Sequence, residues 1–214
     1  MSTKKLENSN SFSAWGALTE EARRISERSQ EIVSDIVSDE SPEGKIKQRV
    51  VMATGDPTFK DLLRFTNNPI NAGIEAIKRG APIYTDIMMV KSGISRGVEA
   101  FGSEVVCWLA RDEIGLKQNL TRASTGFRKL GGKLKESIVV IGNAPSAALT
   151  LSEMVNEKIF PALIIATPVG FVNAAESKER IRLLPTPSIT TVGTRGGTPV
   201  AVAIVNELIT MAKF

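Results

Sequence analysis

The sequence predicts an α/β fold in which a five-stranded parallel sheet is flanked by helices. Two observations support this prediction. From about Pro82 onward, short β-rich runs alternate with helical patterns, and most of the runs end in segments rich in Gly, Pro and small polar residues. Such alternation is typical of parallel strands joined by right-handed helical crossovers. The expected strands are Ile83–Ile87, Glu104–Leu109, Ser137–Ile141, Ala162–Ala166 and Ser188–Val192.

Helical patterns fill the gaps between these strands and follow the last one. The expected helices are Thr121–Lys135, Ser146–Lys158, Ala174–Leu183 and Pro199–Ala212, together with a short helix from about Lys45. Parallel strands need crossover connections of this kind, because each strand must start again from the same edge of the sheet.

A further helix is expected to begin near Thr19, because Glu20 and Glu21 suit the positive N-terminal end of a helix. Its buried stripe repeats at spacings of three and four. The stripe consists of Ala22, Ile25, Ser29, Ile32 and Ile36. The hydroxyl of Ser29 interrupts this apolar face, so Ser29 either bonds the backbone of its own helix or faces a polar ligand.

Length and composition fit a single domain. A chain of 214 residues with 42% hydrophobic content is long enough for a sizeable core and is ordinary for a globular protein. We expect residues 14–214 to form this domain and the mostly polar residues 1–13 to be a flexible segment. The sequence has no run of about 18 apolar residues and no signal-peptide pattern, so we expect a cytoplasmic protein with no membrane partner.

Residue usage disfavours several classes of function. The net charge of +4 is spread along the chain, so no nucleic-acid partner is expected. Histidine, the commonest metal ligand, is absent, and no metal site is expected. Cys107, the only cysteine, lies in an apolar run, which favours a buried inert thiol over a nucleophile. Neither a G-x-G-x-x-G pattern nor a P-loop occurs, so nucleotide-dependent catalysis is not favoured.

A ligand site is expected at the carboxyl ends of the strands, where loops converge and helix N-termini present free N–H groups. The loops there are Asp86–Gly93, Gly142–Ser146, Thr167–Asn173 and Gly193–Thr198, and each is also compatible with a plain strand-to-helix turn. Asn143 is expected to fix one turn and Pro145 to open the helix after it. Gly170 and Phe171 either let the chain approach closely and place an aromatic wall against an apolar face, or pack into the core.

Several segments match one protein family, in order, from about Arg28 to Leu208. They are Arg28–Ser29, Arg49–Ala53, Gly80–Ile83, Met89–Val90, Thr121–Arg122, Ile141–Pro145, Pro168–Lys178 and Gly196–Gly197. In these segments the chain resembles the precorrin-8X methylmutases. The stretch PVGFVNAAESK, at Pro168–Lys178, is the most specific part of the resemblance.

The resemblance implies a homodimeric α/β isomerase of cobalamin biosynthesis that requires no cofactor. Proteins of this family shift a methyl group between adjacent ring C carbons, converting precorrin-8X or its cobalt form to hydrogenobyrinate or cobyrinate. The corrinoid lies between the subunits in that family, so the resemblance also implies a site at the subunit interface.

The resemblance further implies substrate-binding roles for four residues, and the position of Arg195 beside Gly196 and Gly197 suggests a fifth. Arg122 matches an arginine that holds a substrate carboxylate, and its planar fork of donors suits that role. Arg28 has the same interpretation, with a solvated helix position as the alternative. Ser29 matches a serine on the family's first helix, and Ser95 matches a hydroxyl position on the loop after the first strand. Arg195 could add a carboxylate contact, with a solvent-facing side chain as the alternative.

The main departure from the family is Met52, which occupies the position of the catalytic histidine in the segment RVVMA. A thioether has no proton to donate, and losing a general acid typically lowers a rate by about a hundredfold to ten-thousandfold. The alternative is that Met52 only fills apolar space on its helix. Asp56, Asp86 and Lys91 could replace the acid if burial shifts their pKa toward neutrality.

Two hypotheses follow from these residues. The first is a methylmutase that works without the histidine, and the alternative is a non-catalytic paralogue that binds a corrinoid or another tetrapyrrole. Met52 is the feature that separates them.

Overall fold

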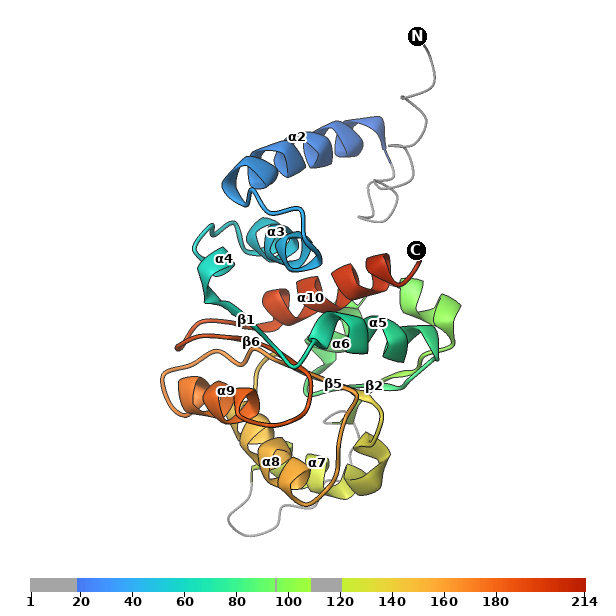
Figure 1. The fold of residues 1–214 in the computed structure, drawn as a ribbon, viewed down its shortest axis with the longest axis vertical. Coiled ribbons are helices and arrows are strands. Elements are labelled where there is room, and N and C mark those ends of the chain that lie inside the picture. Colours follow the sequence, from blue (N-terminus) through green and yellow to red (C-terminus); the bar gives the residue numbers. More distant parts are fainter. Residues whose placement is uncertain (1–18, 95, 109–120) are drawn as a thin grey trace.

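Helices and strands alternate through the computed structural model, which describes residues 19–94, 96–108 and 121–214 (Figure 1). The strands are β1 (Leu63–Thr66), β2 (Ile83–Thr85), β3 (Val105–Cys107), β4 (Ile138–Ile141), β5 (Leu163–Ala166) and β6 (Ser188–Thr191). The helices are α2 (Glu20–Ile36), α3 (Pro42–Thr54), α4 (Phe59–Leu62), α5 (Pro69–Lys78), α6 (Met88–Gly93), α7 (Arg122–Leu130), α8 (Pro145–Asn156), α9 (Ala174–Arg182) and α10 (Thr198–Met211). Short 3-10 segments occupy Arg96–Phe101 and Gly131–Leu134. The segment expected to be flexible, residues 1–13, lies outside the described residues.

The strands form one sheet in the order β1-β6-β5-β4-β2-β3. The parallel strands β2 to β6 confirm the five expected from the sequence. A sixth strand, β1, was not expected from the sequence and runs antiparallel to β6, with Leu63 opposite Thr191. A strand of four residues, LRFT, shows too little periodicity to be recognised, and its partner lies far along the chain.

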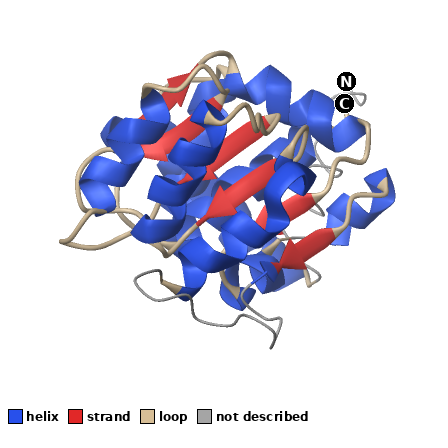
Figure 2. Ribbon diagram, turned by 90° about the horizontal axis from the view of Figure 1, so that it is seen from below, coloured by secondary structure: helices blue, strands red, loops and turns tan. Residues whose placement is uncertain are grey.

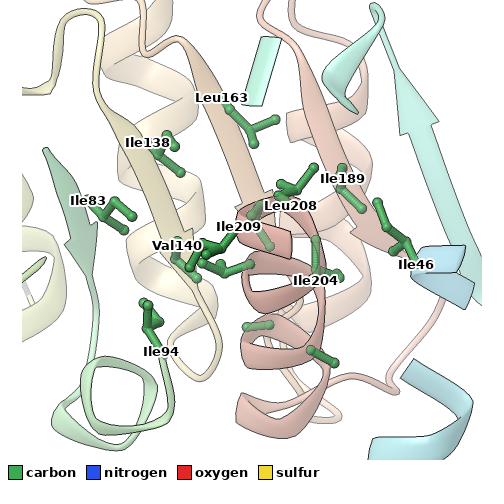
Figure 3. Close-up of a cluster of buried hydrophobic side chains, with 14 of the residues drawn as sticks. Ile46, Ile83, Ile94, Ile138, Val140, Leu163, Ile189, Ile204, Leu208 and Ile209 are labelled. Carbon is green, nitrogen blue, oxygen red and sulfur yellow. The ribbon is translucent and has the colours of Figure 1, made fainter. Parts of the chain in front are cut away.

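Helices cover both faces of the sheet (Figures 1 and 2). On one face, α3, α5, α6 and α10 pack against alternate strand residues, and Figure 3 shows Ile138, Leu163 and Ile189 turned toward Ile204 and Leu208 of α10. On the other face, α7, α8 and α9 cover the intervening residues, such as Val139 and Ile164. Every residue of β4 and β5 is buried, which explains why these strands are continuously apolar in the sequence.

Side-chain caps fix the starts of three helices. Thr19, Ser41 and Thr121 each accept a hydrogen bond from the backbone N–H three residues later, at 3.1, 3.1 and 3.2 Å. The expected start near Thr19 is therefore confirmed. The helix expected at Thr121–Lys135 ends earlier, at Leu130, because Gly131 adopts a φ of 51° and the chain continues as a 3-10 segment.

Helix α2 lies outside these layers, against α3, which in turn packs on α10 (Figure 1). The expected burial of its apolar stripe was wrong for the single chain. No residue of α2 is buried, and Ile25 and Ile32 are 61% and 48% exposed. The periodicity correctly predicted the helix, but α3 covers only part of its apolar face. Within the described parts of the chain, no helix has the length and apolarity needed to span a membrane.

Candidate functional site

A groove of about 280 Å³ lies between α2 and the C-terminal half of α3. It is lined by Ser29, Ile32, Val33, Ile36, Val51, Met52, Gly55 and Pro57. Two of the residues singled out in the sequence, Ser29 and Met52, thus share one mostly apolar cleft. Pockets for drug-sized ligands usually have volumes of about 300–1,000 Å³, so this groove can accept part of a macrocycle but not the whole of it.

Ser29 is half-buried in the α2 wall of the groove. Its Oγ donates a hydrogen bond of 2.8 Å to the carbonyl oxygen of Ile25, one turn earlier. The backbone bond offered as one alternative is therefore present. Because this bond uses the hydroxyl proton, the oxygen lone pairs remain available to accept a hydrogen bond from a ligand.

Met52 lies in the opposite wall, in the last turn of α3, and is half-buried. It does not belong to either buried core cluster, whereas its neighbours Val50 and Val51 are buried. The helix ends two residues later at Thr54, and the next residue, Gly55, caps it with a φ of 65° and lines the groove. Met52, which the resemblance places at the position of the family's histidine, therefore lines the groove.

Arg195 lies in the loop between β6 and α10 and is bound to the segment that follows α3. Its guanidinium pairs with the carboxylate of Asp56 and donates a 2.6 Å hydrogen bond to Thr58 Oγ1. Its Cζ also lies 4.7 Å from the ring centroid of Phe59. The carboxylate that binds Arg195 in the folded chain is therefore the protein's own Asp56, while 43% of the Arg195 side chain stays exposed to solvent.

The other two arginines do not line the groove. Arg28 is exposed on α2, where its Nη1 lies 2.9 Å from Oε2 of Glu31. Arg122 is exposed in the first turn of α7, in the helix layer on the opposite face of the sheet from α3. One chain therefore does not bring Arg122 together with Ser29. Ser95 lies outside the described residues.

Asp86 follows β2 and is fully buried. Its Oδ1 accepts a 3.0 Å hydrogen bond from Gly142 N, and its Oδ2 accepts bonds of 2.8 and 2.9 Å from Asn143 N and Ala144 N. Burial raises the pKa of this carboxyl, while the backbone hydrogen bonds oppose the rise. The carboxylate thus holds the turn after β4, where Pro145 opens α8 as expected. Of the other two residues that could replace the missing acid, Asp56 forms an ion pair with Arg195, and Lys91 is exposed on α6.

Two apolar side chains beyond the carboxyl end of β5 are exposed to solvent. Phe171 is 96% exposed and Val172 is 77% exposed, so packing of Phe171 into the core, one of the two alternatives, is wrong. The neighbouring β6–α10 loop contacts the end of β5 closely, since Gly197 N donates a 2.6 Å hydrogen bond to Thr167 O. A Cβ at Gly196, whose φ is 158°, would lie 2.3 Å from that same carbonyl oxygen.

Lys178, which was not among the residues expected to have a role, lies in the PVGFVNAAESK stretch and is fully buried in α9. Its Nζ donates hydrogen bonds to Arg195 O at 2.7 Å and to Thr191 Oγ1 at 3.1 Å. The one feature of the sequence that could have pointed to Lys178 is its place inside the segment that most closely resembles the family.

The expected burial of Cys107 is confirmed. Across residues 19–94, 96–108 and 121–214, no group of three or more Cys, Asp or Glu side chains is placed to hold a metal ion.

Comparisons with known proteins agree with this fold. The family model described as precorrin-8X methylmutase matches residues 24–211. The chain is 41% identical to the cobalt-precorrin-8 methylmutase of Methanocaldococcus jannaschii, over 92% of this chain and 98% of that protein. It is 38% identical to the precorrin-8X methylmutase of Pseudomonas aeruginosa, over 78% and 83% of the two chains.

A solved structure of precorrin-8X methylmutase from Thermus thermophilus superposes with a TM-score of 0.82 at 36% identity, covering 88% of this chain and 97% of that one. A second solved structure, named as a precorrin-8X methylmutase related protein, gives a TM-score of 0.77 at 29% identity, covering 85% and 99% of the two chains. The sequence and the fold thus agree over almost the same residues, and the chain belongs to the precorrin-8X methylmutase family.

Proposed function

We propose that this chain is an isomerase of corrin synthesis that moves a methyl group between adjacent ring C carbons of precorrin-8X or cobalt-precorrin-8. The products are hydrogenobyrinate or cobyrinate. The observation that carries the proposal is the groove in which Ser29 of α2 faces the side of α3 that bears Met52. Relatives with these two names match the chain over most of its length.

The reaction is a rearrangement, since the methyl carbon leaves one ring carbon and bonds to its neighbour with no change in composition. The apolar walls of the groove suit the edge of the macrocycle, and Ser29 can accept a hydrogen bond from it. Met52 supplies no acid, so the protein contributes by holding the substrate in a reactive geometry. A flexible thioether packed against the ring edge serves that purpose.

We further propose that two copies of the chain build each site. The groove alone is too small for a corrinoid, and Arg122, which suits a substrate carboxylate, lies on the far face of the same chain. Ile25 and Ile32 of α2 and Phe171 beyond β5 offer the exposed apolar surface that a homodimer interface buries. Arg28, Ser95, Arg122 and Ser29 are the proposed substrate contacts.

The proposed protein is a cytoplasmic biosynthetic enzyme whose single domain extends over residues 14–214. The family match over residues 24–211 supports that extent. The proposed reaction uses no cofactor.

Met52 also favours a second candidate function, a non-catalytic protein that binds a corrinoid. A general acid matched to the family is missing at this position, and the chain contains no histidine that could replace it. Such a protein would keep the groove and the arginines but not the turnover.

Conversion of precorrin-8X, followed by its absorption spectrum, tests the proposal. The wild-type protein is expected to convert the pigment, whereas a stoichiometric spectral shift without conversion supports the binding protein. Met52→His is expected to raise the rate by about a hundredfold or more. The matched control, Met52→Leu, keeps an apolar side chain of similar size and should leave the rate within a few fold. Absence of both conversion and binding at micromolar protein would rule out the proposed function.

A further inference from the structure

Lys178 is a charged side chain placed where solvent does not reach it. Its relative exposure is 0%, and its ammonium group contacts Arg195 O and Thr191 Oγ1. Thr191 Oγ1 also donates a 2.7 Å hydrogen bond to the same Arg195 carbonyl. Two donors from two elements thus converge on one carbonyl oxygen of the β6–α10 loop.

The surroundings of Lys178 do not compensate its charge. Burial, together with a smaller contribution from the nearby Arg182, lowers the pKa of the ammonium group to about 8. Within the part of the chain that the structure describes, no carboxylate forms an ion pair with Lys178. The Glu179 carboxylate pairs with Arg182, and the Asp56 carboxylate pairs with Arg195. An uncompensated buried cation is unfavourable for folding, so stability does not explain this lysine.

Lys178 holds the backbone carbonyl of Arg195, and the Arg195 side chain contacts the turn that follows α3, next to the groove. The guanidinium binds Asp56 and Thr58, and the Asp56 carboxylate in turn accepts hydrogen bonds from Thr58 N at 2.9 Å and from Thr58 Oγ1 at 2.7 Å. Gly55 and Pro57, on either side of Asp56, line the groove. A continuous set of contacts therefore runs from Lys178 through Arg195 to the groove wall.

We propose that Lys178 is a positioning residue, which fixes Arg195 and thereby holds the Gly55–Pro57 wall of the groove in place for the ligand. The nature of the ligand in this inference rests on the proposed function. The contacts of Lys178 with Arg195, and of Arg195 with Asp56 and Thr58, do not depend on it. Arg195, on this proposal, orders the groove wall and does not bind a substrate carboxylate.

Lys178→Met tests the proposal, because a methionine of similar length removes the donor and the buried charge together. The melting temperature is expected to stay the same or to rise, as often happens when a buried ion is replaced by an apolar side chain. Amide hydrogen exchange at residues 55–59 and 193–196 is nevertheless expected to accelerate about tenfold or more, because the turn loses its support. The control, Lys133→Met, changes an exposed lysine and should alter neither region.

A second measurement uses hydrogenobyrinic acid as the probe. Lys178→Met and Arg195→Met should each weaken its binding about tenfold, which is roughly 1.4 kcal/mol, and the double variant should be little weaker than either single one. Additive losses would mean that the two residues act separately and would overturn the proposal. So would unchanged exchange at residues 55–59 in Lys178→Met.

Two further outcomes are also decisive. If wild-type protein ignores hydrogenobyrinic acid and precorrin-8X, the proposed function fails, while the exchange measurement still decides the role of Lys178. If Lys178→Met does not fold, Lys178→Leu takes its place, since it also removes the donor to Arg195 O but has a shorter, branched apolar side chain. Exchange at residues 55–59 that is faster than in wild type supports the proposal, and equal exchange contradicts it.

Discussion

Nη1 of Arg49 lies 3.4 Å from Oε2 of Glu207, in an ion pair that joins α3 to α10. Only 14% of the Arg49 side chain and 8% of the Glu207 side chain are exposed. Burial raises the pKa of Glu207 and lowers that of Arg49, and the attraction between the two charges opposes both shifts. The pair fixes the helix that carries Met52 against the body of the domain.

Removing one partner of this pair should be costly. Arg49→Met leaves the Glu207 carboxylate buried without its cation, so we expect the free energy of unfolding to fall by about 3 kcal/mol. Replacing both residues, with Arg49→Met and Glu207→Leu, should recover most of that loss. Denaturant titrations of the three variants measure the effect, and a single-variant loss below about 1 kcal/mol would contradict it.

Asp86→Asn should loosen the turn after β4. The asparagine has one carbonyl oxygen where the carboxylate accepts three backbone N–H bonds, so at least one buried donor loses its acceptor. We expect a loss of about 3 kcal/mol in the free energy of unfolding. The control Asp61→Asn alters an exposed carboxylate and should change stability by less than about 0.5 kcal/mol. Equal stability of the two variants would show that Asp86 does not hold the turn.

Lys178 should make stability depend on pH in a defined window. Burial lowers its pKa from 10.5 to about 8, so between these values the unfolded chain binds a proton that the folded chain does not. The free energy of unfolding should therefore rise with pH across that window, by up to about 3 kcal/mol from this residue, and should be independent of Lys178 titration below pH 8. The measurement is the difference in stability between wild type and Lys178→Met at several pH values. A constant difference from pH 7 to pH 10.5 would contradict the lowered pKa.

Arg122→Gln should weaken corrinoid binding and leave the fold unchanged. The side chain is exposed at the start of α7, so the free energy of unfolding should change by no more than about 0.5 kcal/mol. Loss of a charge-assisted contact with a ligand carboxylate should weaken binding of hydrogenobyrinic acid about tenfold to a hundredfold. Arg79→Gln is the matched control, because Arg79 is also exposed and pairs only at the surface with Glu136, at 3.4 Å. If the two variants bind equally well, Arg122 is not a substrate contact.

The sequence predicted most of the sheet because parallel strands covered on both faces are continuously apolar, as Ile138–Ile141 and Leu163–Ala166 are. It could not predict β1, whose four residues form a strand through pairing with the distant Ser188–Thr191. The periodicity of α2 was read correctly, yet periodicity does not show whether another chain or solvent covers Ile25 and Ile32.

The candidate site was predicted in part. The resemblance singled out Ser29 and Met52, and the structure brings both into one groove. The pairing of Arg195 with Asp56 and the burial of Lys178 depend on how the α3–α4 turn, the β6–α10 loop and α9 meet in space. No local pattern encodes such contacts, because their members come from three separate regions of the chain.

Gly196 limits how the site can be redesigned to bind another pigment, because this position does not accept a side chain. Any L-amino acid there would place its Cβ 2.3 Å from Thr167 O, and the clash is with backbone that no rotamer change can relieve. A combinatorial library should therefore keep glycine at position 196 and vary Ser29, Ile32 and Met52, whose side chains line the groove.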